Sequence, residues 1–270
     1  MLRNESVKIA GRDRTIDCHL IFPGPGGAPR PAVIVIHEIF GPSDHMLDIG
    51  ERFAREGYVA AVPNLFSGEL EQILTPANIA LAMQSFSQAP PGLRRDPAKL
   101  AEFAASQPAE RRPALEAFGR ISTPPVQAGF AHDLRAVADF LRRLPDVDPA
   151  RLGAVGFCFG GAMAARLATV DPALRAAVIF YGQNPPLEDV PAIRAAVLGL
   201  YGGEDPGITD TVPLLAEAMR AADRRFTSHV YPGAKHAFFN DSRPANYQAE
   251  AAQDAWPRVL AFFRTELDGR

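Results

Sequence analysis

Short, wholly apolar segments recur along this chain of 270 residues and constrain its fold most strongly, because they alternate with longer segments of helical periodicity. The first, residues 32–36, reads Ala-Val-Ile-Val-Ile, as expected of a strand buried on both faces of a parallel sheet. Further strands are predicted at 58–62, 151–157, 176–181, 196–201 and 226–231, and helices at 44–56, 132–144, 211–222 and 248–267. The alternation predicts an α/β fold with a mostly parallel central sheet flanked by helices.

Two stretches depart from this alternation. Residues 6–10 and 15–22 are rich in β-branched side chains and predict an opening antiparallel hairpin. Residues 64–127 carry many prolines, and helical spacing at 75–88 and 97–118 predicts a helical cap-like insertion over an active site.

Composition and charge disfavour several classes of protein. Apolar residues make up 47% of the chain and charged residues 22%, which is typical of a globular protein, and we expect one domain over 1–270. The net charge of −3, without a basic run, disfavours nucleic acid and membrane surfaces as partners. No apolar run reaches the roughly 18 residues of a membrane span, and no signal peptide is recognisable. Two cysteines are too few for a disulfide framework, so we expect a cytoplasmic protein.

The segment Gly156-Phe157-Cys158-Phe159-Gly160-Gly161 stands between a predicted strand and a predicted helix of small residues. This is the setting of a nucleophile elbow, G-x-S-x-G, with cysteine in place of serine. The N-terminus of the following helix lowers the pKa of a thiol, which favours the thiolate. We therefore interpret Cys158 as a nucleophile and the Phe159 amide as a donor to an oxyanion.

Two other interpretations of this segment are weaker. An isolated cysteine is most often a small buried apolar residue. A glycine-rich turn before a helix can also bind a dinucleotide, but the spacing here is G-x-x-x-G-G and no acidic residue follows a next strand at the usual distance. Glycines on both sides of the cysteine, in a strand-turn-helix setting, favour the nucleophile.

An acid and a base follow the cysteine along the chain. Asp205 comes after the strand predicted at 196–201, and His236 comes after the strand predicted at 226–231. Taken alone, Asp205 fits a turn before Pro-Gly, and His236 fits a loop histidine bonded to backbone. Together they give the order nucleophile, acid, histidine, and predict a triad with Cys158.

Polar residues also follow the first apolar strand, in His37-Glu38-Ile39-Phe40-Gly41. This is where the loop that completes an oxyanion hole is expected, so the Ile39 amide is a candidate second donor. Glu38 is either a carboxylate that influences thiol ionisation or a structural acid in a salt bridge.

Metal binding is the other chemistry that this region suggests. His37, Asp44 and His45 are candidate ligands, but the sequence contains neither a helical pair of histidines at i, i+4 nor a cysteine cluster. We expect no metal ion.

Four motifs, in order, resemble those of the dienelactone hydrolase family of α/β-hydrolases, and the resemblance covers nearly the whole chain. They are HEIFG at 37–41, GFCFGG at 156–161, GEDP at 203–206 and GAKHAF at 233–238. The resemblance implies that a small ester or lactone is hydrolysed through a thioester, without a cofactor. It implies that Cys158, His236 and Asp205 form the catalytic triad and that Glu38 helps to control the thiol. It also implies that the backbone amides of Ile39 and Phe159 form the oxyanion hole.

One departure limits the substrate that the resemblance implies. Family members that act on dienelactone hold its carboxylate with an arginine shortly after the catalytic histidine, where this chain reads Ala237-Phe-Phe-Asn240. Arg243, or Arg94 or Arg95 in the insertion, are candidate replacements. The alternatives are a carboxylesterase or thioesterase of other specificity and a non-catalytic binding protein on the same fold. In each case we expect the protein to be a monomer or a homodimer.

Overall fold

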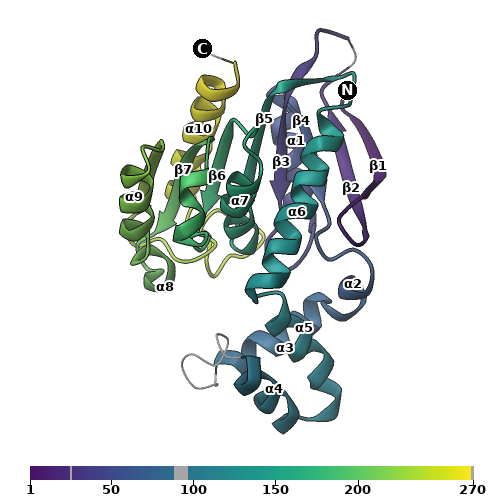
Figure 1. The fold of residues 1–270 in the computed structure, drawn as a ribbon, viewed down its shortest axis with the longest axis vertical. Coiled ribbons are helices and arrows are strands. Elements are labelled where there is room, and N and C mark those ends of the chain that lie inside the picture. Colours follow the sequence, from purple (N-terminus) through teal and green to yellow (C-terminus); the bar gives the residue numbers. More distant parts are fainter. Residues whose placement is uncertain (25, 88–96, 269–270) are drawn as a thin grey trace.

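The computed structural model describes residues 1–24, 26–87 and 97–268 (Figure 1). Among them, eight strands form one sheet in the order β1-β2-β4-β3-β5-β6-β7-β8. The β1–β2 and β2–β4 pairs are antiparallel and the other pairs are parallel, which confirms the opening hairpin and the mostly parallel sheet. The strands are β1 (Arg3–Ala10), β2 (Thr15–Phe22), β3 (Arg30–Ile36), β4 (Val59–Pro63), β5 (Val147–Phe157), β6 (Ala176–Phe180), β7 (Ala196–Gly202) and β8 (Phe226–Tyr231).

Helices cover both faces of the sheet because successive strand residues point to opposite sides. In β3, Ile34 and Ile36 join one core cluster, and Val33 and Val35 join the other. The first cluster includes side chains of α6, α7 and α9, and the second includes side chains of α1 and α10; Figure 1 shows α6 and α7 across the near face. The helices are α1 (Asp44–Arg55), α6 (Pro124–Leu141), α7 (Phe159–Val170), α8 (Pro206–Thr209), α9 (Val212–Ala221) and α10 (Ala249–Phe263).

The described residues between β4 and α6 form short helices that lie beyond the carboxyl ends of the parallel strands (Figure 1). One helix predicted over 97–118 is wrong, because α4 ends at Ser106. Pro108 has no N–H group with which to continue a helix, and a second helix begins at Arg112. The elements are α2 (Glu69–Ile73), α3 (Pro76–Ser87), α4 (Pro97–Ser106), a 3₁₀ turn (Ala109–Arg111) and α5 (Arg112–Arg120).

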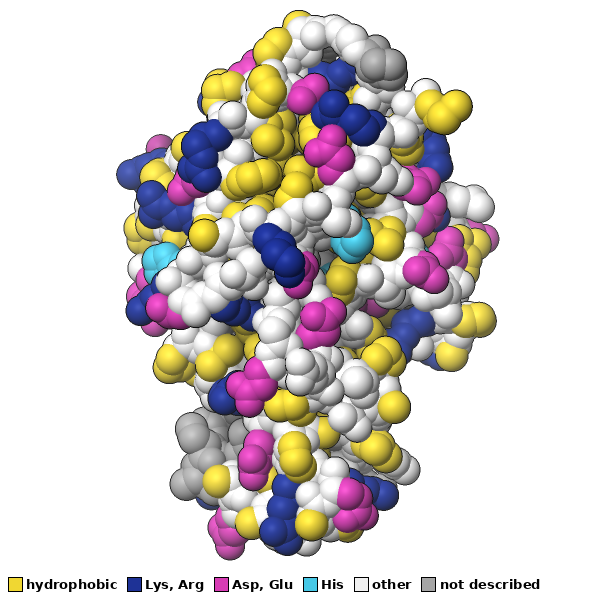
Figure 2. Space-filling view, turned by 90° about the vertical axis from the view of Figure 1, so that its right-hand side faces the viewer, with side chains coloured by type: hydrophobic (Ala, Val, Ile, Leu, Met, Phe, Trp, Pro, Cys, Tyr) yellow, Lys and Arg dark blue, Asp and Glu magenta, His cyan; other side chains and the backbone are white. Residues whose placement is uncertain are grey.

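Other boundaries differ by a few residues from those predicted. The helix predicted at 132–144 begins at Pro124, within the predicted insertion, and ends at Leu141. The helix predicted at 248–267 ends at Phe263 and continues as a π turn over Arg264–Asp268. None of the helices in the described residues has the length and apolar character that crossing a membrane requires. Figure 2 shows basic and acidic side chains interspersed over the face on the β1–β2 side.

Candidate active site

The turn between β5 and α7 holds Cys158 in a conformation that side chains rarely adopt, with φ 56° and ψ −113°. Glycines make the turn possible. A Cβ atom on Gly156 would lie 1.9 Å from the Gly160 carbonyl oxygen, and a Cβ on Gly160 would lie 2.2 Å from the Ile36 carbonyl oxygen. The backbone N–H of Cys158 donates to the Phe180 carbonyl oxygen at 3.0 Å. This backbone geometry is the one expected of a nucleophile elbow, and the Cys158 side chain is half-buried.

The structure brings Cys158, His236 and Asp205 into one hydrogen-bonded line. His236 Nε2 lies 3.0 Å from Cys158 Sγ, and His236 Nδ1 lies 2.6 Å from Asp205 Oδ2. The three residues follow β5, β8 and β7 at the same edge of the sheet. The His236 side chain is 37% exposed and that of Asp205 is 14% exposed, so the line opens to solvent at the histidine.

Partners on both ring nitrogens control the charge of His236. Burial lowers the pKa of the imidazole, but the hydrogen bonds and negative charges of Asp205 and Cys158 outweigh it and raise the pKa from 6.5 to about 10. The ring is therefore an imidazolium near neutral pH, which places a charged donor against the sulfur. Asn246 Nδ2 donates to the His236 carbonyl oxygen at 2.9 Å and steadies the loop that carries the ring.

Glu38 is buried, and both of its carboxylate oxygens have a neutral donor. The Tyr181 hydroxyl lies 3.3 Å from Oε1, and Asn240 Nδ2 lies 2.7 Å from Oε2. Burial, followed by the negative charge of Glu38, raises the pKa of Tyr181 well above 10, so the phenol keeps its proton. Among the described residues Glu38 forms neither an ion pair nor a hydrogen bond to Cys158. The alternative that Glu38 is a structural acid in a salt bridge is therefore not supported by the described residues.

Two backbone amides next to the reactive segments remain free to bind a ligand. Within the described parts of the chain, neither the Ile39 amide nor the Phe159 amide donates a hydrogen bond to another group. Phe159 is the first residue of α7, where amides have no partner inside the helix. Ile39 lies in a turn in which the Gly41 amide donates to the Glu38 carbonyl oxygen at 3.2 Å.

Of the predicted substrate-binding arginines, the structure describes only Arg243. Its guanidinium carbon lies 4.0 Å from the centre of the Phe40 ring, and the side chain is half-buried. No carboxylate of the described residues pairs with it. Its positive charge opposes the rise in the pKa of Tyr181 that burial and Glu38 cause, so Arg243 lies near enough to Tyr181 to interact with it electrostatically. Arg94 and Arg95 lie outside the described residues.

The histidines of the weaker metal alternative have other partners. His37 bonds to backbone groups, and His45 Nδ1 lies 3.1 Å from Asp241 Oδ1. Asp44 occupies the first turn of α1. In the described parts of the chain, no three His, Cys, Asp or Glu side chains lie close enough together to hold a metal ion.

Three residues around this site were not singled out from the sequence. Tyr181 directly follows β6, so the rule that placed the triad at strand ends offered a signal for it. Asn240 ends the stretch 237–240 in which the resemblance implies an arginine, and the absence of that arginine was the signal. Asn246 carries no local signal, because its partner is a backbone carbonyl group brought near by the loop.

A sequence profile of the dienelactone hydrolase family matches residues 20–267 of this chain. A protein of Saccharolobus solfataricus named "Putative carboxymethylenebutenolidase" is 38% identical over 242 residues, covering 87% of this chain and 90% of its own. A protein of Escherichia coli K12 with the same name is 33% identical and covers 90% of this chain and 79% of its own.

Solved structures agree with these relatives. The crystal structure titled "Putative Dienelactone Hydrolase" from Klebsiella pneumoniae has a TM-score of 0.71 and 31% identity, covering 97% of this chain and 98% of its own. A dienelactone hydrolase from Anabaena variabilis, with a TM-score of 0.61 and 17% identity over 98% of this chain and 99% of its own, shares the fold. The chain is therefore a hydrolase with the α/β-hydrolase fold and belongs to the dienelactone hydrolase family.

Proposed function

We propose that the protein hydrolyses a small carboxylic ester or lactone through a triad of Cys158, His236 and Asp205. The observation that carries this proposal is the unbroken line from Sγ to Nε2 at 3.0 Å and from Nδ1 to Oδ2 at 2.6 Å, built on a strained elbow. A charged imidazole beside the sulfur favours the thiolate, which is the nucleophilic form of cysteine.

In the acylation step, the Cys158 thiolate attacks the carbonyl carbon of the substrate. The carbonyl π electrons move to oxygen, and the resulting oxyanion is held by the N–H groups of Ile39 and Phe159. The oxyanion then collapses and breaks the bond between carbon and the alcohol oxygen. His236 Nε2 gives its proton to that oxygen, which leaves a thioester on Cys158 and a neutral imidazole. In a lactone the alcohol stays attached to the same molecule.

Deacylation uses the same residues in the opposite protonation state. Neutral His236 takes a proton from water, and the hydroxide adds to the thioester carbon. The second oxyanion collapses by breaking the carbon–sulfur bond, which releases the carboxylic acid and restores the thiolate beside the imidazolium. Asp205 keeps the ring in its orientation and stabilises its positive charge throughout. No metal or organic cofactor enters any step.

Arg243 is the described residue that fits recognition of a carboxylate on the substrate. It lacks an acidic partner among the described residues, and its stacking on Phe40 places it next to the Ile39 turn. The second candidate is a carboxylesterase or thioesterase whose substrate carries no carboxylate. This alternative is favoured by the stretch 237–240, which contains no arginine and whose Asn240 side chain donates to Glu38.

The setting of the enzyme follows from the chemistry of the thiol. A catalytic thiolate must stay reduced, and both cysteines are free, so we place the protein in the cytoplasm. We further propose one domain, monomeric or homodimeric, in which the insertion at 64–127 acts as a cap over the substrate.

Hydrolysis of p-nitrophenyl acetate and of dienelactone by the native protein and by Cys158→Ala tests this function. We expect kcat/KM to fall by at least about 10³-fold in the variant. A cooperative thermal unfolding transition near the native melting temperature would show that the variant folds. Iodoacetamide should alkylate Cys158 near neutral pH long before Cys18, because burial raises the pKa of Cys18 to about 12. Activity that survives in Cys158→Ala would refute the triad. Turnover of p-nitrophenyl acetate without turnover of dienelactone would favour the second candidate.

A further inference from the structure

His37 is a buried histidine whose two ring nitrogens bond to two different backbone segments. The Leu65 amide donates to Nε2 at 3.0 Å, and Nδ1 lies 2.6 Å from the Glu38 carbonyl oxygen. A backbone amide can only donate, so Nε2 is an acceptor and the proton is on Nδ1. Burial lowers the pKa of His37 to about 4, which keeps the ring neutral in this single tautomer.

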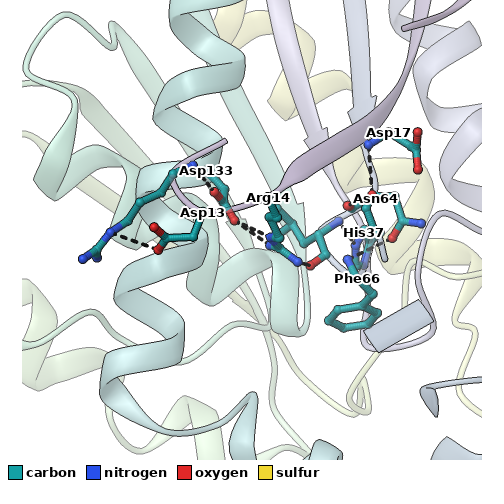
Figure 3. Close-up of polar contacts among 10 residues, drawn as sticks. Asp13, Arg14, Asp17, His37, Asn64, Phe66 and Asp133 are labelled. Carbon is teal, nitrogen blue, oxygen red and sulfur yellow. Dashed lines mark hydrogen bonds and ion pairs between the residues drawn. The ribbon is translucent and has the colours of Figure 1, made fainter. Parts of the chain in front are cut away.

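Leu65 is in turn held through its carbonyl group by a residue of the hairpin. Arg14, at the tip of the β1–β2 hairpin, donates from Nη1 to the Leu65 carbonyl oxygen at 2.7 Å. The same guanidinium donates to Asp133 Oδ2 on α6 from Nε at 2.8 Å and from Nη2 at 2.6 Å. Figure 3 shows Arg14 lying between Asp133 and the segment of Asn64 and Phe66. A line of hydrogen bonds therefore runs from α6 through Arg14, Leu65 and His37 to the Glu38 carbonyl group.

Further contacts leave this line little freedom. Asn64 Oδ1 accepts from the Phe66 amide at 2.9 Å, and the Asn64 amide donates to the Asp17 carbonyl oxygen at 2.7 Å. The His37 ring packs edge-on to Phe66 with centroids 4.9 Å apart and stacks on Phe159 at 6.0 Å. His37 thus contacts the ring of the residue whose amide is the other proposed oxyanion donor.

We propose that His37 is a positioning residue that sets the orientation of the peptide between Glu38 and Ile39, and so presents the Ile39 N–H to the oxyanion. The inference rests on the proposed function. In a trans peptide the C=O and N–H bonds point in opposite directions, so the atom that holds the Glu38 carbonyl group also aims the Ile39 amide. If this peptide turned over, it would present a carbonyl oxygen where the oxyanion needs a donor.

The Glu38 carbonyl oxygen also accepts from the Gly41 amide, at 3.2 Å. That bond closes the turn from Glu38 to Gly41, in which Gly41 has φ 79°. The shorter bond from His37, at 2.6 Å, ties the turn to the buried line described above. The bond from His37 therefore links the orientation of the Glu38–Ile39 peptide to residues outside the turn itself.

Two substitutions separate the two bonds of His37. In His37→Asn the side-chain NH₂ group can take the place of Nδ1 and keep the donor to Glu38, whereas in His37→Gln the side-chain oxygen can take the place of Nε2 and keep only the acceptor for Leu65. With p-nitrophenyl acetate we expect kcat to fall roughly 10-fold or more in His37→Gln at nearly unchanged KM, because the oxyanion forms only in the transition state. We expect His37→Asn to stay within about 3-fold of the native kcat, since one donor bond is preserved.

Thermal unfolding and crystal structures of both variants complete the test. A purely structural role predicts that kcat falls in step with the melting temperature, in whichever order the two variants are destabilised. A turned peptide in His37→Gln and a native peptide in His37→Asn would support the inference. A native peptide and equal kcat in both variants would overturn it. A native protein without esterase activity would refute the proposed function instead, and the peptide orientation in the two variants would still decide the role of His37.

Discussion

Asn240 Nδ2 donates a 2.7 Å hydrogen bond to Glu38 Oε2, across 202 positions of the sequence. The other oxygen of the same carboxylate accepts from Tyr181. Glu38 is thus held by two neutral donors and has no cationic partner within hydrogen-bond distance among the described residues. The stretch 237–240 contains no arginine, so the departure from the resemblance removes a positive charge from the loop that contacts Glu38.

The first prediction concerns the removal of this donor. Asn240→Ala leaves a buried carboxylate oxygen without a partner, which costs about 1–3 kcal/mol, and more when the group is charged. We expect the free energy of unfolding to fall by about 2–3 kcal/mol in urea denaturation. Ser242→Ala is the matched control, because it removes only the hydroxyl bond to Asn240 Oδ1 and should change the free energy by about 0.5 kcal/mol. Equal effects of the two substitutions would contradict the assigned role of Asn240.

The second prediction concerns Asp205, the acid of the proposed triad. Asp205→Asn keeps the shape of the side chain but no longer stabilises a charged imidazole, and an amide NH₂ facing Nδ1 favours the wrong tautomer. We expect kcat to fall about 10³- to 10⁴-fold while KM changes little. Glu204→Gln removes the neighbouring exposed carboxylate and should leave kcat within about 2-fold. A comparable loss in both variants would mean that general negative charge, and not the bond to His236, supports the reaction.

The third prediction concerns the titration of His236, whose pKa in the folded protein is about 10 against 6.5 as its ordinary value. Because the folded pKa is raised, the contribution of this histidine to stability is complete below about pH 6.5 and is lost as the pH rises towards 10. We expect NMR titration of the His236 ring to show the imidazolium at pH 7–8. In Asp205→Asn the midpoint should move to lower pH, since a hydrogen bond and a negative charge are removed. A native midpoint at or below 6.5 would show that burial prevails.

Much of the fold was predictable because the signals are local. Apolar runs such as 32–36 mark buried strands, and the carboxyl ends of parallel strands meet at one edge of a sheet, which explains why Cys158, Asp205 and His236 approach one another. The missed break after Ser106 is also local: helical spacing continues through the sequence, but Pro108 removes a backbone donor.

The contacts that surround the site were not predictable in the same way. Tyr181 and Glu38 are 143 positions apart, and Arg14 and Asp133 are 119 positions apart. Three of these residues have ordinary roles when considered alone: Tyr181 is a strand-end tyrosine, Arg14 a turn arginine and Asp133 a helix aspartate. Only the packing of the hairpin tip against α6 gives Arg14 and Asp133 their common function, and periodicity in one segment contains no information about that packing.

The last prediction concerns two glycines that differ in the space around them. A Cβ on Gly160 would lie 2.2 Å from the Ile36 carbonyl oxygen and 2.6 Å from that of His37, so β3 and α7 would have to separate. We expect Gly160→Ala to lose more than about 4 kcal/mol of stability or to fail to fold. Gly129 lies on α6, where an added Cβ would meet no atom of the described residues within 4 Å, and Gly129→Ala should stabilise the protein by about 0.5–1 kcal/mol. Thermal unfolding of both variants checks this. A Gly160→Ala protein with the native melting temperature would show that the elbow tolerates a larger separation between α7 and β3.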